Sequence, residues 1–230
     1  MTGRKRVAVL ASGGGSNLQA VLDHLAALGE RRSADVVLVV AGRETAGALE
    51  RARRAGVATA VASPDSLAAI LDRDAIDLVV LAGYLSFVPT AVTERWAGRI
   101  INIHPALLPS FGGHGLFGVR VHRAVLAAGA RLSGATVHFV DAEYDRGPII
   151  AQWPVPVAEG DTAESLAARV LRVEHLLLPR AVDALARGAV SLAADGRVRG
   201  GAAIAPPTAF SLHLPDDATL AADIDALFPA

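Results

Sequence analysis

Residues 36–40 read Val36-Val37-Leu38-Val39-Val40, a run of branched apolar side chains with no polar interruption. A strand with one solvent-facing side alternates apolar and polar residues, whereas a strand inside a parallel sheet is covered on both faces and stays apolar. This run therefore predicts a central strand of a parallel sheet. By the same criterion we expect strands near residues 5–11, 34–41, 57–62, 77–82 and 99–104.

The segments between these strands are rich in alanine and space their apolar residues as helices do, which predicts helices near residues 16–29, 45–55, 65–73 and 89–96. Strands that alternate with helices are typical of βαβ units. We therefore expect the α/β class, with a Rossmann-like, mostly parallel, twisted sheet flanked by helices.

The second half of the chain departs from this simple alternation. In chain order we expect a helix, a hairpin-like pair of strands and a long helix, near residues 119–128, 133–140, 148–156 and 162–187. Asp161 or Thr162 would be the N-cap of the long helix. After about residue 190 the pattern decays, and residues 191–230 form a C-terminal tail of unknown role. The tail could dock on the body, mediate an oligomer contact or stay mobile.

Composition excludes several function classes. A chain of 230 residues with 52% hydrophobic content fits one α/β domain with a large core. The chain has no cysteine, which excludes disulfides, thiolate metal sites and a cysteine nucleophile. Its net charge of -1 and the lack of a basic stripe argue against a nucleic-acid partner. No apolar run approaches the ~18 residues that span a bilayer, so we expect a soluble, cytoplasmic protein.

One basic cluster does occur, at Arg51, Arg53 and Arg54. These residues lie at helical spacing with Glu50 inside a predicted helix. We therefore interpret the cluster as a solvated helix face.

Two polar side chains interrupt the apolar strand near residues 99–104. Asn102 and His104 are two positions apart, so they project to one face of the strand while Ile101 and Ile103 project into packing. An amide N–H can donate to an oxygen that gains negative charge, and an imidazole can donate to the same oxygen or exchange a proton with it. The pair suits acyl chemistry, and a strand edge with two satisfied polar residues is the plainer alternative.

A glycine-rich loop follows the first strand and opens a helix, with the sequence Ser12-Gly13-Gly14-Gly15-Ser16-Asn17-Leu18. Backbone N–H groups at such a turn, together with the positive end of the helix dipole, can bind a phosphate monoester. Glycine would let the anion approach the main chain without a Cβ in the way. The loop matches neither the dinucleotide fingerprint, which needs a small residue at Leu18, nor a P-loop. A tight strand-to-helix turn is the alternative.

Three further sequence segments accompany Asn102-Ile103-His104-Pro105. The first, Leu107-Leu108-Pro109, follows it almost directly, and the other two, Val137-His138-Phe139-Val140 and Asp145-Arg146-Gly147-Pro148, lie downstream. From about residue 6 to about residue 190 the chain resembles the folate-dependent formyltransferase family, in particular the phosphoribosylglycinamide formyltransferases of purine synthesis. The resemblance implies the formyltransferase fold. It also implies transfer of a formyl group from 10-formyltetrahydrofolate, a co-substrate, to the amine of 5'-phosphoribosylglycinamide, with no metal.

The same resemblance implies roles for individual residues. Asn102, His104 and Asp145 match the family's catalytic residues, and His138 matches a further active-site histidine. The nucleotide site would use the phosphate-binding segment and a glutamate near the ribose and amine, here Gly15, Ser16, Asn17 and Glu174. The folate pocket would be bordered by Leu85, Ser86, Phe87, Val88, Asn102, Val140, Asp141 and Asp145.

The resemblance also divides the chain. Residues 1–190 would form the formyltransferase domain, with a nucleotide-binding half over about residues 1–100 and a folate-binding, catalytic half over about residues 101–190. The small-molecule substrates would be the only partners, and the sequence leaves open whether the protein is a monomer or a homodimer.

The chain departs from the family pattern at several positions. Ser86 stands where a basic residue is common, Leu67 lies near the place of a frequent arginine, and Arg146 replaces a usual glycine. The first two departures imply weaker contacts to the folate tail. The loop at residues 112–118 is longer than usual, and its glycines imply a mobile or tightly turned lid.

Alternatives remain at this stage. The same residues could serve a formyltetrahydrofolate deformylase or a methionyl-tRNA formyltransferase-like enzyme. A non-catalytic nucleotide-binding module is a further alternative, and it leaves the catalytic residues without a purpose. Glu174 could be no more than an exposed helix charge near Arg169 or Arg172.

Overall fold

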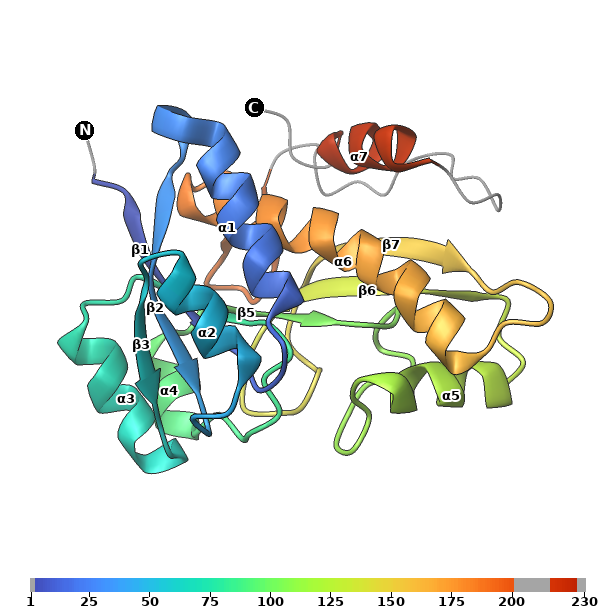
Figure 1. The fold of residues 1–230 in the computed structure, drawn as a ribbon, viewed down its shortest axis with the longest axis horizontal. Helices are drawn as coiled ribbons and strands as arrows, with labels where there is room; N and C mark the ends of the chain where they lie inside the picture. The colour runs from blue at the N-terminus through green and yellow to red at the C-terminus, as the bar shows by residue number, and fades with distance from the viewer. Residues whose placement is uncertain (1–2, 201–215, 227–230) are drawn as a thin grey trace.

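A seven-stranded sheet forms the centre of the protein (Figure 1). The structure, a computed structural model, describes residues 3–200 and 216–226. The strand order is β3-β2-β1-β4-β5-β6-β7. Five strands are parallel: β1 (Lys5–Leu10), β2 (Ala34–Ala41), β3 (Ala58–Val61), β4 (Leu78–Leu81) and β5 (Ile100–His104). The antiparallel pair β6 (Leu132–Phe139) and β7 (Ile149–Pro156) completes the sheet.

Helices cover both faces of this sheet. One face carries α1 (Ser16–Leu28), α2 (Gly47–Arg54), α5 (Val119–Ala127) and α6 (Ala163–Ala186), and the short 3-10 helix Gly29–Arg31 follows α1. The other face carries α3 (Pro64–Arg73) and α4 (Thr90–Arg95). The predicted strands and helices up to residue 187 are confirmed, with small differences at their ends, and so is the α/β class. Thr162 is the N-cap of α6, since its side chain accepts from the Ser165 N–H at 3.1 Å.

Strand β1 shows why an unbroken apolar run forms a central strand. Val7 and Val9 point into the core cluster beneath α1 and α6, while Ala8 and Leu10 point into the cluster beneath α3 and α4. All four side chains are fully buried. None of these four positions faces solvent, so no polar residue is needed at them, and the charged residues Lys5 and Arg6 stand at the start of the strand, where it is less buried.

The strand order creates a crevice at one edge of the sheet. Strand β1 pairs with β2 on one side and with β4 on the other. The chain runs from β1 through β2 to β3 on one side, and after β3 it crosses to β4 on the other side of β1. In open α/β sheets, ligands bind at the carboxyl ends of the strands beside such a switch point. The glycine-rich loop follows β1, residues 82–88 follow β4, and Asn102 and His104 end β5. The topology therefore gathers three predicted site segments at one edge.

Part of the C-terminal tail docks on the body. A small hairpin, β8 (Ser191–Leu192) with β9 (Val198–Arg199), follows α6, and helix α7 (Asp217–Asp225) packs beside α6 (Figure 1). Leu220 and Ile224 of α7 join the larger core cluster, and Asp217 and Asp225 pair with Arg172 and Arg180 of α6. Docking is thus the outcome for residues 216–226. The rest of the tail, residues 201–215 and 227–230, lies outside the described residues.

Among the helices in residues 3–200 and 216–226, none is both long and apolar enough to cross a membrane.

Removing the apolar contacts of α7 should weaken the fold. Leu220 is 3% exposed and Ile224 is 0% exposed, so the double change Leu220→Ala, Ile224→Ala removes two buried side chains. We expect the free energy of unfolding to fall by about 2–4 kcal/mol, measured by urea denaturation. Asp223→Ala, at an exposed position of the same helix, is the matched control and should change stability by less than about 0.5 kcal/mol. An unchanged double variant would show that α7 does not stabilise the body.

Candidate active site

Strand β5 fixes two of the predicted site residues, and its pairing with β6 adds a third. Asn102 and His104 share the face opposite Ile101 and Ile103, which lie in the core as predicted. In the antiparallel register Asn102 stands opposite His138. Cross-strand neighbours lie side by side, so the register brings the amide and the second imidazole together.

Asp145 reaches the same place from the loop that joins β6 to β7. Its φ is 56°, in the left-handed region that few non-glycine residues adopt. The Gly113 N–H holds the carboxylate by donating to Oδ2 at 2.9 Å. A Cβ at the neighbouring Gly112 would lie 2.4 Å from Leu108 Cδ2 and 3.1 Å from Asp145 Cβ, so a larger residue there would displace the Leu108 side chain and press on Asp145. The glycine-rich loop at residues 112–118 therefore packs against Asp145 and orients it.

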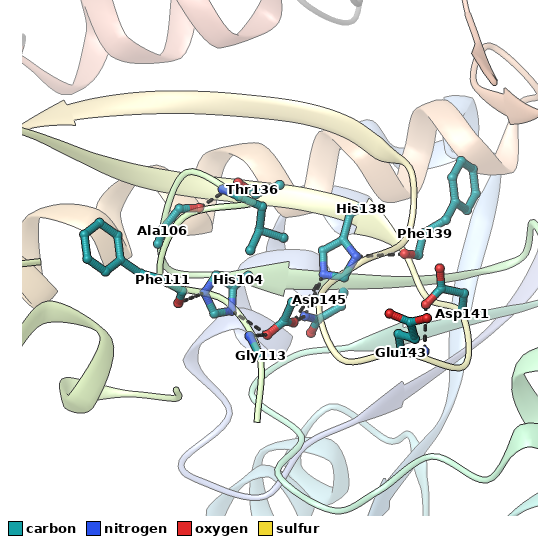
Figure 2. Close-up of polar contacts among 12 residues, drawn as sticks. His104, Ala106, Phe111, Gly113, Thr136, His138, Phe139, Asp141, Glu143 and Asp145 are labelled. Carbon is teal, nitrogen blue, oxygen red and sulfur yellow. Dashed lines mark hydrogen bonds and ion pairs between the residues drawn. The ribbon is translucent and has the colours of Figure 1, made fainter. Parts of the chain in front are cut away.

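Four groups surround the Asp145 carboxylate, as Figure 2 shows for His104, His138 and Gly113. His104 Nδ1 lies 3.5 Å from Oδ2, and His138 Nε2 lies 3.6 Å from Oδ1. Asn102 Nδ2 lies 3.4 Å from Oδ1 and 3.0 Å from His138 Nε2. The fold thus brings together Asn102, His104, His138 and Asp145, which the sequence places in three separate segments.

Backbone carbonyls determine which imidazole nitrogens carry hydrogen. His104 Nε2 lies 2.9 Å from the Phe111 carbonyl, and His138 Nδ1 lies 2.7 Å from the Phe139 carbonyl. A carbonyl oxygen only accepts, so both of these nitrogens donate. In a neutral ring the other nitrogen then bears a lone pair, and in both rings that nitrogen faces Asp145. The pair of His104 Nδ1 and Asp145 Oδ2 is therefore a site that accepts a proton.

The pKa values fit this assignment. Burial lowers the pKa of His104 below its ordinary value, and the Asp145 charge offsets only part of that effect. Burial raises the pKa of Asp145, but the His138 side chain, the positive charge that His104 carries when it is protonated, and the Gly113 N–H together lower it below its ordinary value. At neutral pH the carboxylate is therefore ionised and the imidazole is neutral.

Two cavities meet at these residues. The larger, of about 520 Å³, is lined by Asn17, Glu174, His104 and the loop from Gly113 to Val119. The smaller, of about 90 Å³, is lined by residues that follow β4 and by the loop from Val140 to Asp145. Asn102, Asp145, Tyr84 and Tyr144 line both cavities. The Asn102 amide and the Asp145 carboxylate therefore stand where the two cavities meet.

In the larger cavity, Asn17 and Glu174 form a buried pair. Asn17 Nδ2 donates to Glu174 Oε2 at 2.6 Å, and both residues are at least nine-tenths buried. The alternative of an exposed helix charge at Glu174 is therefore wrong. Burial raises the pKa of Glu174, and the Asn17 hydrogen bond opposes that rise. Asn17 Oδ1 is buried and has no hydrogen-bond partner among the described residues.

Gly15 and Ser16 stand at the start of α1 and do not line the larger cavity. Gly15 is the N-cap, with φ 75°, and a Cβ there would lie 2.8 Å from Ala48 Cα. The left-handed backbone and the close approach of α2 therefore require glycine at this position. This reason is additional to the expected one, room for an anion, which stays a prediction.

Most of the predicted folate residues line the smaller cavity, namely Ser86, Phe87, Val88, Asn102, Val140, Asp141 and Asp145. Leu85 does not: it is 56% exposed and borders the larger cavity. The departure at Leu67 also has no direct bearing on a ligand, because Leu67 is a fully buried residue of α3 and lines neither cavity.

Sequence reasoning missed several residues of the site. Tyr144 borders both cavities, and its ring contacts those of Phe87 and His114, with centroids 6.0 Å and 5.6 Å away. Its position beside Asp145 was the only signal for it in the sequence. His122 lies buried against the larger cavity with Nδ1 unpartnered among the described residues. Its place on α5 gave no signal, because a histidine on a helix is usually structural.

Within residues 3–200 and 216–226, no group of three or more His, Asp and Glu side chains is arranged to hold a metal ion. The expectation of metal-free chemistry stays a prediction.

A family model described as formyl transferase matches residues 5–182. The chloroplastic phosphoribosylglycinamide formyltransferase of Arabidopsis thaliana is 43% identical over 204 residues, which cover 84% of this chain and 69% of that protein. The trifunctional purine biosynthetic protein adenosine-3 of Bos taurus is 39% identical over 85% of this chain and 20% of its own length. The crystal structure of glycinamide ribonucleotide transformylase 1 from Symbiobacterium toebii is 41% identical, with a TM-score of 0.78 over 86% of this chain and 95% of that one.

The chain therefore belongs to the formyl transferase family, whose model spans most of it. Within that family it groups with the phosphoribosylglycinamide formyltransferases, as the Arabidopsis relative shows. The resemblance drawn from the motifs is confirmed, and so is the expected class of enzyme.

Titration of His104 tests the electrostatics of the site. We expect NMR to give His104 a pKa below 6.5, because burial disfavours the imidazolium, and a still lower pKa in Asp145→Asn, because Asp145 raises it. The unfolded chain takes up this proton near pH 6.5, so burial of His104 makes stability fall as the pH drops below that value.

The His104→Gln variant identifies the resonance, and His24, which lies against α7 rather than Asp145, is the control that should not shift in Asp145→Asn. A His104 pKa above 6.5, or one that rises in Asp145→Asn, would contradict the assignment.

Proposed function

We propose that this protein transfers the formyl group of 10-formyltetrahydrofolate to the amine of 5'-phosphoribosylglycinamide, with Asn102, His104 and Asp145 as its catalytic residues. The observation that carries the proposal is that Asn102 and Asp145 line both cavities. Two substrates held in two cavities can exchange a small group only where those cavities meet, and the acid–base and amide groups stand at that junction.

The lining of each cavity favours one substrate. Asn17 and Glu174 offer hydrogen bonds to ribose or amine groups in the larger cavity, near the N-terminus of α1, where a phosphate is stabilised. The smaller cavity has apolar walls from Val88 and Val140, with the exposed rings of Phe87 and Tyr144 beside it. Flat, partly apolar walls with a few polar groups suit the pterin of a folate.

In the proposed reaction, the amine nitrogen forms a bond to the formyl carbon, and the carbonyl electrons move onto its oxygen. The incoming amine loses a proton, and the pair of His104 Nδ1 and Asp145 is placed to accept it. The resulting N–H of His104 can then donate to the oxyanion. When the intermediate collapses, the bond from the formyl carbon to the folate nitrogen breaks and that nitrogen takes up a proton. Protons balance overall, since the amine loses one and the folate gains one.

Asn102 must change its hydrogen bonds to take part. Its two amide hydrogens are directed to His138 Nε2 at 3.0 Å and to Asp145 Oδ1 at 3.4 Å. The contact with Asp145 is at the long limit of a hydrogen bond, so it is the weaker of the two. We infer that this hydrogen turns to the oxyanion while His138 keeps the other and holds the amide in place.

The proposal extends to the partners and the location of the protein. We expect small-molecule substrates, no nucleic acid, and a monomer or homodimer in the cytoplasm. The name of the Arabidopsis relative includes the word chloroplastic, so that relative does not support a location in the cytoplasm. The cytoplasmic location stays a prediction for this chain. The domain division at about residue 190 is likewise a proposal, supported by a family match that ends at residue 182.

The reaction itself is tested by incubating the protein with 10-formyltetrahydrofolate, with and without 5'-phosphoribosylglycinamide, and following folate absorbance. We expect loss of the formyl-folate only when the nucleotide is present. Loss without the nucleotide would instead identify a deformylase, in which water replaces the amine. No loss in either case would favour a nucleotide-binding module.

Changes at the junction should reduce turnover rather than affinity. Asn102→Ala, His104→Ala and Asp145→Ala should each lower kcat by roughly 10²–10³-fold with a small change in the KM of the ribonucleotide, because they act on the oxyanion and the proton. The double change of His104 and Asp145 should cost less than the sum of the two single changes in activation free energy, since the two residues share one proton.

Steady-state kinetics on folded variants provide the measurement. Arg146→Ala, at the exposed position after Asp145, is the matched control and should stay within a few-fold of the unchanged protein. A near-normal kcat in Asp145→Ala would remove Asp145 from the proton step and leave His138 as the next candidate.

A further inference from the structure

Three consecutive carbonyl groups in the glycine-rich loop after β1 accept hydrogen bonds from one neighbouring part of the chain. Ser12 O accepts from Arg43 Nη2 at 3.4 Å, Gly13 O from the Ala48 N–H at 3.0 Å, and Gly14 O from Arg51 Nε at 2.7 Å. All three donors come from α2 and the segment before it. Helix α2 and the segment before it therefore fix the direction in which three consecutive carbonyl groups point.

This orientation fixes where the next N–H groups point. In a planar trans peptide the C=O and the following N–H point in opposite directions. The N–H groups of Gly13, Gly14 and Gly15 therefore point away from α2. None of the three donates to another group among the described residues. Gly13 and Gly14 are exposed, so their N–H groups are open to a ligand, whereas Gly15 is buried and its N–H has no partner among the described residues. A row of open backbone N–H groups binds the oxygens of a phosphate.

Arg51 differs from the basic residues beside it. Arg53 and Arg54 pair with Glu50, and their side chains are 54% and 73% exposed, as expected for a solvated face. Arg51 instead turns inward: besides Gly14, its Nη1 donates to Gln19 Oε1 on α1 at 3.4 Å. The prediction that all three arginines share a solvated face is therefore wrong for Arg51. Its guanidinium joins the loop and the helix that the loop opens.

We propose that Arg51 is a positioning residue for phosphate binding, and this rests on the proposed function. By donating to Gly14 O it holds that peptide so that the Gly15 N–H faces the phosphate of the ribonucleotide. Without this donor the Gly14–Gly15 peptide can rotate, because both residues that flank it are glycines, whose backbone dihedral angles are less restricted than those of other residues. The donors for the phosphate would then no longer be aligned.

Two substitutions separate the hydrogen bond from the charge. Gln carries an amide N–H donor at the position of Arg Nε, so Arg51→Gln keeps the bond to Gly14 and loses the charge. Met fills the same volume with neither, so Arg51→Met loses both. We expect Arg51→Met to raise the KM of the ribonucleotide about tenfold, while the KM of the folate and kcat at saturation change less than twofold. Arg51→Gln should stay within about threefold of the unchanged protein. Arg54→Met is the matched control from the solvated face and should have no effect.

A second measurement does not depend on turnover. Inorganic phosphate should raise the melting temperature of the unchanged protein and of Arg51→Gln, and raise it much less for Arg51→Met. Equal KM values for the ribonucleotide in Arg51→Met and Arg54→Met would overturn the proposal. A KM for the ribonucleotide in Arg51→Gln as high as in Arg51→Met would also overturn it, because loss of the charge alone would then explain the effect. Similar losses for both substrates would overturn it as well, because they indicate a general structural role. If the formyl-transfer assay fails but the phosphate shift still requires Arg51, the proposed function falls and the role of Arg51 stands.

Discussion

The carboxylate of Asp145 is the group on which the rest of the site depends. A largely buried carboxylate costs several kcal/mol unless hydrogen bonds and nearby charges offset its burial. Here the Gly113 N–H and the Asn102 amide donate to the carboxylate, and the rings of His104 on β5 and His138 on β6 lie beside it. The lowered pKa of Asp145 shows that these contacts outweigh burial. Each of the contributing elements is therefore held in place by the same charge that it stabilises.

Two carboxyl groups of the larger cavity have their pKa values shifted in opposite directions. Burial raises the pKa of Glu174, and the Asn17 hydrogen bond opposes that rise, whereas the groups around Asp145 lower its pKa despite its burial. Groups of the same chemistry thus acquire different proton affinities from their surroundings. Asp145, ionised beside a neutral imidazole, suits proton transfer at the junction of the cavities. Glu174, beside the start of α1, suits hydrogen bonding to a substrate held there.

The two halves of the site are supported in different ways. The nucleotide side depends on α2, whose Ala48 N–H and Arg51 side chain bind two carbonyls of the glycine-rich loop after β1. The catalytic side depends on the β5–β6 register and on a second glycine-containing loop, in which a Cβ at Gly112 would lie 3.1 Å from Asp145 Cβ and the Gly113 N–H donates to the carboxylate. In both cases a loop supplies the chemistry, and a neighbouring element fixes the direction in which its polar groups point.

The sequence by itself determined the features that depend on near neighbours along the chain. The apolar run at residues 36–40 predicts a strand covered on both faces, and the spacing of Asn102 and His104 puts them on one strand face, because these properties follow from backbone periodicity alone. Only the tertiary structure decided that His138 stands opposite Asn102, that Glu174 is buried against Asn17, that Arg51 turns onto the loop, and that α7 docks on α6. These contacts join residues from 36 to 157 positions apart, or elements that meet only through the core, and their formation depends on sheet register and helix packing. Arg51 and Arg54 illustrate the difference: both have the helical spacing of a solvated cluster, and only the neighbouring loop distinguishes them.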